Sequence, residues 1–90
     1  MALPKKIVLD DGGKRSLKKL PQSAQRLVLK KLCEYNDKPQ LIASNVKQLT
    51  DTTPPKTRLR IGDYRGVGIV VGYTLYINII IDRKDLERSI

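Results

Sequence analysis

The chain has 90 residues, which is enough for one small domain, residues 1–90, with a single hydrophobic core. Eighteen Lys and Arg against nine Asp and Glu give a formal net charge of +9, which favours nucleic acid, an anionic surface or an acidic protein as the partner. With no histidine and one cysteine, Cys33, the composition excludes an internal disulfide, a histidine-based catalytic triad and a zinc site, and it suits a reducing cytoplasm.

The first part of the chain predicts a strand followed by two helices. Residues 5–10 (KKIVLD) are typical of a strand that ends at Asp11-Gly12-Gly13. Residues 14–20 indicate a short helix, and Pro21 suits the first turn of a second helix. The second helix is predicted to end at Asn36 to Pro39, and its apolar residues follow helical spacing: Ala24, Leu27, Val28, Leu32 and Tyr35. We expect this pair to form an αα-hairpin that covers the core face of a sheet.

The middle of the chain separates these helices from two predicted hairpins. Residues 40–49 (QLIASNVKQL) predict one more helical turn, and Thr50 to Pro55 predict a polar loop. Gly62-Asp63 and Gly72-Tyr73 each indicate a two-residue turn with Gly first, as a type II′ turn prefers. We therefore expect three antiparallel strands joined by two tight turns.

The lengths of the two turns set the register of these strands. The first turn places Arg60 opposite Arg65, and the second places Val70 opposite Leu75. A three-residue second loop is the alternative, but the glycine that both turns share favours two residues. The predicted core face comprises Leu59, Ile61, Tyr64, Gly66, Gly68, Val70, Leu75, Ile77, Ile79 and Ile81. The predicted open face comprises Lys56, Arg58, Arg60, Arg65, Val67, Ile69, Val71, Thr74, Tyr76, Asn78 and Ile80.

The open face gathers four cations because side chains alternate between the faces of a strand: Lys56, Arg58, Arg60 and Arg65. Like charges placed opposite each other are destabilising unless an anion lies between them. The cluster therefore predicts a phosphate site, and arginines also stabilise the charge that develops when a 2′-hydroxyl attacks a phosphate. The apolar part of the same face, which includes Val67, Ile69 and Val71, predicts a protein partner.

Three stretches of the chain, in this order, resemble the RelE/ParE superfamily of toxins from bacterial and archaeal toxin-antitoxin pairs. They are NDKPQLIASNVKQLT (36–50), RLRIGDYR (58–65) and the hairpin end IIIDRKDLERSI (79–90). The resemblance implies an α+β fold, a small antiparallel-rich sheet with an N-terminal helical hairpin on one face. It also implies cleavage of messenger RNA in the ribosomal A site, without metal or cofactor, which leaves a 2′,3′-cyclic phosphate.

The resemblance also implies roles for individual residues. Lys56 and Arg58 match basic positions on the second strand of such enzymes, Arg65 matches the arginine after the turn, and Arg83 matches the arginine of a C-terminal motif. These four are the expected catalytic residues, with Lys56 as a candidate general base or a phosphate contact. The residues expected to bind RNA or its phosphates are Arg60, Lys84, Tyr76 and Lys47. Tyr76 would stack on a base or contact a partner protein at the rim.

The C-terminal motif departs from the family pattern at two positions. The pattern is often His-Arg-x-x-x-Tyr or Gly-Arg-x-x-x-Tyr, and here Asp82 and Glu87 replace its first and last residues. The absence of the tyrosine hydroxyl puts the cleavage of RNA in question more than the binding of RNA. Two other functions therefore stay open beside the endoribonuclease: a ParE-like, non-enzymatic inhibitor of DNA gyrase, and a degenerate member that only binds RNA or its antitoxin.

The partners expected from this resemblance are a cognate acidic antitoxin and either the ribosome with its messenger RNA or DNA gyrase. A membrane is not expected, because no apolar run approaches the ~18 residues of a spanning helix. The N-terminus also lacks the apolar core of a signal peptide, so the sequence predicts a cytoplasmic protein.

Overall fold

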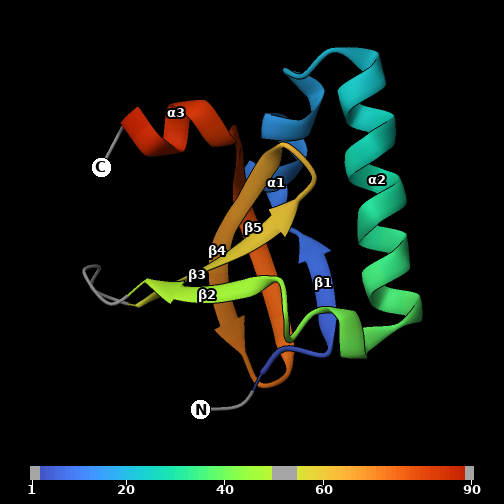
Figure 1. Cartoon of the computed structure of the whole chain (residues 1–90), viewed down its shortest axis with the longest axis vertical. Helices are drawn as coiled ribbons and strands as arrows, with labels where there is room; N and C mark the ends of the chain where they lie inside the picture. The colour runs from blue at the N-terminus through green and yellow to red at the C-terminus, as the bar shows by residue number, and fades with distance from the viewer. Residues whose placement is uncertain (1–2, 50–54, 89–90) are drawn as a thin grey trace.

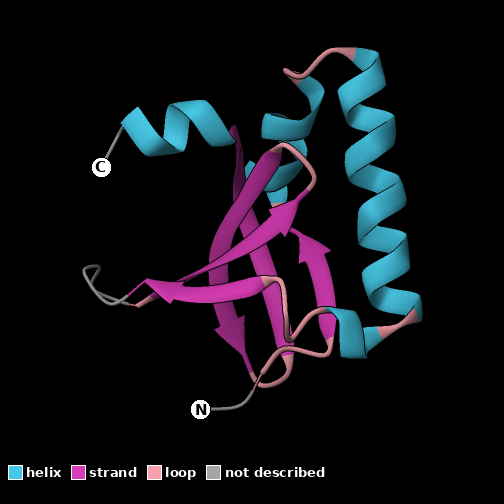
Figure 2. Cartoon of the chain, viewed as in Figure 1, coloured by secondary structure: helices cyan, strands magenta, loops and turns pink. Residues whose placement is uncertain are grey.

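The chain folds into a five-stranded sheet with two helices packed on one face (Figures 1 and 2). The computed structural model describes residues 3–49 and 55–88. In chain order the elements are β1 (Lys6–Leu9), α1 (Asp11–Lys18), α2 (Gln22–Asp37), a 3₁₀ turn (Pro39–Leu41), β2 (Val46–Leu49), β3 (Lys56–Ile61), β4 (Tyr64–Val71), β5 (Thr74–Asp82) and α3 (Arg83–Arg88). No helix among the described residues has the length and apolar character needed to cross a membrane.

The strands are ordered β1-β5-β4-β3-β2 across the sheet. β1 runs parallel to β5, and the other neighbouring strands pair antiparallel. Helices α1 and α2 cover one face, whereas α3 leaves the end of β5 on the opposite side (Figure 1). The predicted α+β fold, an antiparallel-rich sheet with a helical hairpin on one face, is confirmed.

The core lies between α2 and the sheet. Val28 of α2, Ile42 and the strand residues Leu59, Ile61, Leu75 and Ile77 have no exposed surface. Burial of each such side chain contributes about 1.5–3 kcal/mol to folding, so this layer supplies the main driving force. The apolar spacing that predicted α2 is confirmed, since Val28, Leu32 and Tyr35 all belong to this core.

Helix α1 begins at Asp11, three residues before the predicted start at residue 14, and ends at Lys18. Asp10 explains the early start, because its carboxylate accepts a hydrogen bond from the Gly13 N–H (2.9 Å) and caps the helix. Gly12 and Gly13 lie in the first turn because β5 passes close to it. A Cβ on Gly12 would lie 2.7 Å from the carbonyl oxygen of Asn78. The two glycines thus permit close packing rather than ending the strand.

Both predicted two-residue turns are confirmed. Gly62 and Gly72 have φ of 60° and 62°, as the first central residue of a type II′ turn requires. Arg60 pairs with Arg65 across the first hairpin, and Val70 pairs with Leu75 across the second. The three-residue alternative for the second loop is therefore excluded.

The predicted register of β5 is wrong beyond Ile77 because the strand contains a β-bulge at Asn78. Gly68 pairs with Ile77 but the adjacent Val67 pairs with Ile79, which leaves Asn78 without an opposite residue. The side chains after the bulge therefore exchange faces. Ile80, predicted on the open face, is buried in the core. Ile79 and Ile81, predicted in the core, lie on the open face, and Ile79 is 42% exposed.

Docking of the N-terminal segment accounts for the bulge. The Asp10 N–H donates to the Ile77 carbonyl (3.0 Å), and the Ile80 N–H donates to Ser16 Oγ (3.1 Å). These bonds occupy backbone groups of β5 on either side of the bulge.

The segment of residues 40–49 also differs from its prediction. Its helical part is limited to the 3₁₀ turn Pro39–Leu41, and Val46–Leu49 forms β2, an edge strand that pairs with β3. The loop predicted from Thr50 to Pro55 lies outside the described residues except for Pro55.

Candidate nucleic-acid interface

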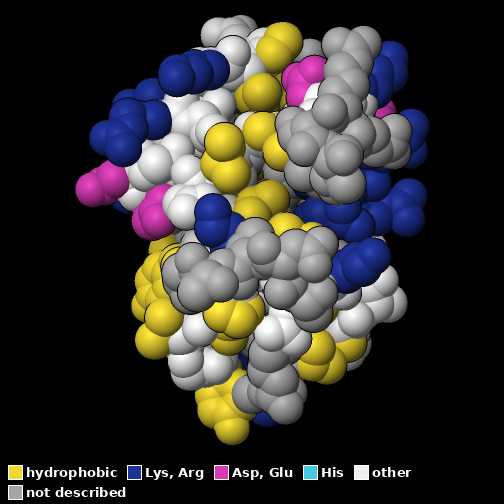
Figure 3. Space-filling model, turned by 90° about the vertical axis from the view of Figure 1, so that its left-hand side faces the viewer, with side chains coloured by type: hydrophobic (Ala, Val, Ile, Leu, Met, Phe, Trp, Pro, Cys, Tyr) yellow, Lys and Arg dark blue, Asp and Glu magenta, His cyan; other side chains and the backbone are white. Residues whose placement is uncertain are grey.

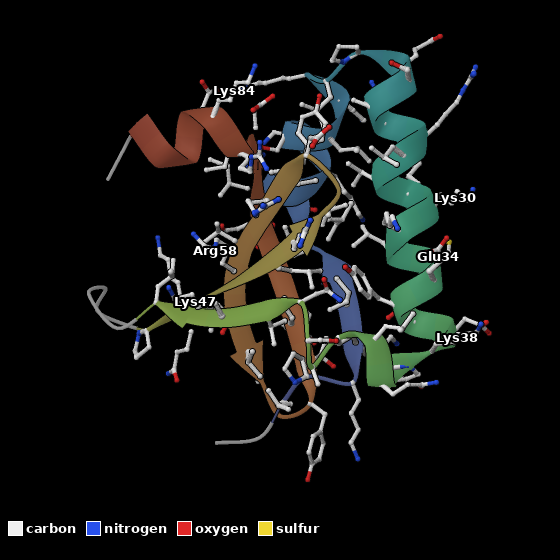
Figure 4. The ribbon with its side chains drawn as sticks, in the orientation of Figure 1. Lys30, Glu34, Lys38, Lys47, Arg58 and Lys84 are labelled. Carbon is white, nitrogen blue, oxygen red and sulfur yellow. The ribbon has the colours of Figure 1, made fainter. Side chains whose placement is uncertain are left out.

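The cationic residues of β2, β3 and β4 meet on the face of the sheet opposite α1 and α2. The β3 residues Thr57, Leu59 and Ile61 are buried on the helix side, so the alternating residues Lys56, Arg58 and Arg60 lie on the open side. Figure 4 shows Lys47 and Arg58 on this side, away from Lys30 and Glu34 of α2 and from Lys38, which follows that helix. The predicted geometry of the four-residue cluster is confirmed.

Strand pairing brings these cations together from three strands. Lys47 of β2 lies opposite Arg58 of β3, and Arg60 of β3 lies opposite Arg65 of β4. These four side chains, with Lys47 in place of Lys56 of the predicted cluster, line one hollow of about 190 Å³. Residues 44–46 form the rest of its wall. We call this site the basic hollow.

The guanidinium groups around the basic hollow differ in their partners. Arg65 Nη1 donates to the carbonyls of Gly62 (2.9 Å) and Tyr64 (2.8 Å), so this side chain is held against the first turn. Across the described residues, the side chains of Arg58 and Arg60 make no hydrogen bond or ion pair. An anion entering the hollow therefore meets one fixed arginine and two whose donors are available.

The other predicted site residues lie outside the lining of this hollow. Lys56 is half-buried at the start of β3, where it pairs with Leu49. Tyr76 is 40% exposed on β5, and β4 separates it from the arginines of β3. Arg83 and Lys84 line a second hollow of about 290 Å³ together with Asp63 and Asp82. The structure thus divides the predicted residues among four places: the basic hollow, the start of β3, the exposed face of β5 and the second hollow.

Asp82 has a structural role that explains its presence at the start of the C-terminal motif. Its carboxylate accepts a hydrogen bond from the Lys84 N–H (2.8 Å), as a helix N-cap does, and α3 begins at the next residue. The Arg83 N–H donates to the Asp63 carbonyl (3.0 Å), which fixes the start of α3 beside the first turn. The side chain of Glu87 lies outside the described part of the structure.

A scan of protein-family models and a search of curated proteins both find no match to this sequence. Solved structures do match. A chain of the RelBE2 toxin-antitoxin complex from Mycobacterium tuberculosis superposes with a TM-score of 0.69 and 20% identity, over 90% of this chain and all of that one. A chain of the archaeal RelE-RelB complex from Pyrococcus horikoshii OT3 superposes with a TM-score of 0.60 and 22% identity, over 92% of this chain and 97% of that one.

The chain has a RelE-like fold. At these identities the match concerns the arrangement of helices and strands, and the chemistry of the site has to be argued from the residues present. The basic hollow is formed only by Lys and Arg among the charged residues. Within the described residues no group of three or more His, Cys, Asp or Glu could hold a metal ion.

The apolar part of the open face continues from the basic hollow in this RelE-like sheet. The exposed apolar surface comes from Val71 (62% exposed), Tyr76 and Ile79. Ile69 of β4 lies opposite Tyr76 of β5 on the same face. Figure 3, which looks at this side of the molecule, shows hydrophobic side chains between groups of Lys and Arg. The face can therefore contact an apolar surface and an anion at the same time.

Sequence reasoning missed the contribution of residues 44–46 to the hollow. These residues lie in and before β2, a strand of four residues whose sequence was interpreted as helical. Val46-Lys47-Gln48-Leu49 carries no strand signal, because its apolar residues lie three positions apart, a spacing typical of a helical turn and not of a strand.

Proposed function

We propose that this chain is the toxin of a toxin-antitoxin pair and that it cleaves messenger RNA on the ribosome, in the cytoplasm. The observation that carries the proposal is the basic hollow, where Arg58 and Arg60 lie beside the fixed Arg65 without a protein partner among the described residues. A RelE-like fold, shared with chains of two toxin-antitoxin complexes, supports the same function.

Cleavage in this proposal proceeds by transfer within the RNA. The 2′-oxygen bonds to the phosphorus and gives its proton to a base, the bond from phosphorus to the 5′-oxygen breaks, and the 5′-oxygen takes a proton. The products are a 2′,3′-cyclic phosphate and a 5′-hydroxyl. Arg58, Arg60 and Arg65 would donate hydrogen bonds to the phosphate oxygens as negative charge develops on them. In other enzymes, removing one such preorganised donor lowers the rate by about 100-fold or more. Lys56 is the candidate base, and Arg83 would approach from α3.

A gyrase inhibitor of the ParE type is the second candidate, and Asp82 is the observation that favours it. Asp82 caps α3 through the Lys84 N–H, so this position serves the helix instead of supplying the histidine of the enzyme motif. In that case the basic and apolar face would bind a protein, and no RNA would be cut. A degenerate member that only binds RNA or its antitoxin is a third reading.

The partner proposed for the open face is an acidic antitoxin. Its carboxylates would occupy the basic hollow, while an amphipathic helix or an added strand covers the apolar surface at Val71, Tyr76 and Ile79. Binding of antitoxin and of RNA would then exclude each other, and added salt would weaken both. An antitoxin-bound protein that still binds RNA with unchanged affinity would contradict this placement.

Expression of the protein in a bacterial host, followed by primer extension on translated messages, tests the proposal. The wild type is expected to produce new 5′ ends within reading frames and to arrest growth. Arg65→Ala is expected to lower cleavage by about 100-fold. Lys30→Ala removes an exposed cation from the far side of the molecule and is the matched control, expected to cleave like the wild type. Intact messages together with gyrase trapped on DNA would replace this function with the second candidate.

A further inference from the structure

Arg60 lies where the hydrogen-bond ladder between β3 and β2 is incomplete. Its N–H donates to the Asn45 carbonyl (2.8 Å), and in an antiparallel strand the N–H and C=O of one residue point to the same side. A continued ladder would therefore satisfy the Arg60 carbonyl with the Asn45 N–H. That N–H instead donates to the Ile42 carbonyl (2.9 Å), at the turn that precedes β2. The ladder leaves the Arg60 carbonyl without its backbone donor.

Tyr35 supplies the missing donor from the other layer of the fold. Its hydroxyl donates to the Arg60 carbonyl at 2.6 Å, although 25 residues separate the two in sequence. The ring is 6% exposed and belongs to the core cluster with Ile42, Leu59 and Ile61. A side chain of helix α2 thus extends through the core and hydrogen-bonds to the backbone of β3 at Arg60, a residue of the basic hollow.

Burial raises the pKa of the Tyr35 hydroxyl above its usual value, and the charge of Glu34 acts in the same direction. The charges of Arg60 and Arg65 act in the opposite direction and are outweighed by burial. The hydroxyl therefore keeps its proton at neutral pH and remains a donor.

Arg60 and Arg65 form a pair whose charges repel each other. Because the Arg60 N–H points to β2, the two residues form a non-hydrogen-bonded pair, in which the side chains approach most closely, with Cα atoms about 4.5 Å apart. Repulsion would tend to splay the strands at this point. The Arg65 guanidinium is held by the Gly62 and Tyr64 carbonyls, and the Arg60 backbone is held by Asn45 and Tyr35.

We propose that Tyr35 is a positioning residue, whose hydroxyl holds the Arg60 backbone so that Arg60 and Arg65 face one phosphate. Its effect on cleavage rests on the proposed function, whereas its effect on Arg60 does not. Preorganised donors stabilise a transition state without reorganising during the reaction, and a small displacement of such a group lowers the rate by up to about 100-fold.

The variant that tests the proposal is Tyr35→Phe, which keeps the buried ring and removes only the hydroxyl. Tyr73→Phe is the matched control, because Tyr73 is an exposed residue of the second turn and its hydroxyl makes no hydrogen bond to the described residues. The first measurement is amide hydrogen exchange by NMR. We expect Tyr35→Phe to increase the exchange rate of the Arg60 N–H. The factor of increase should be larger than that for the N–H groups of Leu75 and Ile77, which lie in a buried strand. Equal acceleration at all three amides would show a general loss of stability and overturn the proposal.

The second measurement is a double-mutant cycle on ribosome-dependent cleavage. Tyr35→Phe is expected to lower kcat by about tenfold or more with little change in KM. In an Arg60→Ala background the same substitution should lower kcat by less than about twofold, because its effect passes through Arg60. An equal loss in both backgrounds would overturn the positioning role. A wild type that does not cleave would contradict the proposed function, and the exchange measurement would still decide whether Tyr35 holds Arg60.

Discussion

Replacing Arg58 with alanine tests whether the basic hollow, rather than the overall charge of +9, binds RNA. Arg58 is half-buried, lies opposite Lys47 and makes no hydrogen bond or ion pair to the described residues. A charged hydrogen bond contributes about 1.5–3 kcal/mol, and partial exposure places Arg58 at the low end of this range. Affinity for a short single-stranded RNA should therefore fall about tenfold.

The dependence of this affinity on salt gives a second magnitude. Each phosphate contact to a single strand contributes about 0.7 to the slope of log affinity against log salt, so Arg58→Ala should lower that slope by about 0.7. Between about 50 and about 200 mM KCl, the affinity of the variant should then fall about 2.6-fold less than that of the wild type. Fluorescence anisotropy of a labelled oligonucleotide at several salt concentrations measures both quantities.

Lys30→Ala is the control for net charge in this experiment. It removes the same unit of charge from the exposed outer side of α2, on the opposite side of the molecule from the hollow (Figure 4). Its affinity and slope should stay close to those of the wild type. If Lys30→Ala and Arg58→Ala weaken binding equally, RNA is attracted by the whole charged surface, and the reasoning from the hollow is refuted.

Three further predictions concern pH, the sheet and the partner. The pKa of Tyr35 is raised in the folded state, so the unfolded chain loses this proton first as the pH rises above about 10, and the free energy of unfolding falls. Urea denaturation should therefore show a steeper loss of stability with pH for the wild type than for Tyr35→Phe. Gly68→Ala should prevent folding because its Cβ would overlap the Tyr76 backbone, whereas Gly72→Ala, with open space and φ of 62°, should cost about 1 kcal/mol and lower the thermal midpoint by about 4–8 °C. Ile79→Ser should weaken binding of the acidic antitoxin in a titration and leave RNA affinity unchanged; equal antitoxin binding would place the partner elsewhere.

The parts of the site that sequence could predict depend on local signals. Gly62 and Gly72 mark two-residue turns through their own conformational preference, and the turn length alone sets Arg60 opposite Arg65. Alternation along β3 then places Arg58 on the same face. These inferences need no knowledge of the rest of the chain.

The parts that sequence could not predict depend on contacts between distant segments. The bulge at Asn78 reflects the docking of Asp10 and Ser16 on β5, and it moves Ile79 to the open face and Ile80 to the core. In sequence, Tyr35 is indistinguishable from any other apolar residue of an amphipathic helix. Only the tertiary fold shows that its hydroxyl meets the Arg60 carbonyl.

Strand β2 was missed for a different reason. It is four residues long, it has an edge position, and the connection that follows it has no tight-turn signal to announce a hairpin. Lys47 was nevertheless selected through its place in the family resemblance. Its pairing with Arg58 is now a structural fact, whereas its contact with RNA stays a prediction.

The most direct test of the proposed function is to incubate purified protein with messenger RNA, with and without ribosomes bound to that message. We predict that the wild type cuts the ribosome-bound message and leaves a 2′,3′-cyclic phosphate on the upstream fragment. The naked message should stay intact, and Arg65→Ala should lower the rate on ribosomes by about 100-fold. An intact message on ribosomes, or cleavage by Arg65→Ala at the wild-type rate, would contradict the account.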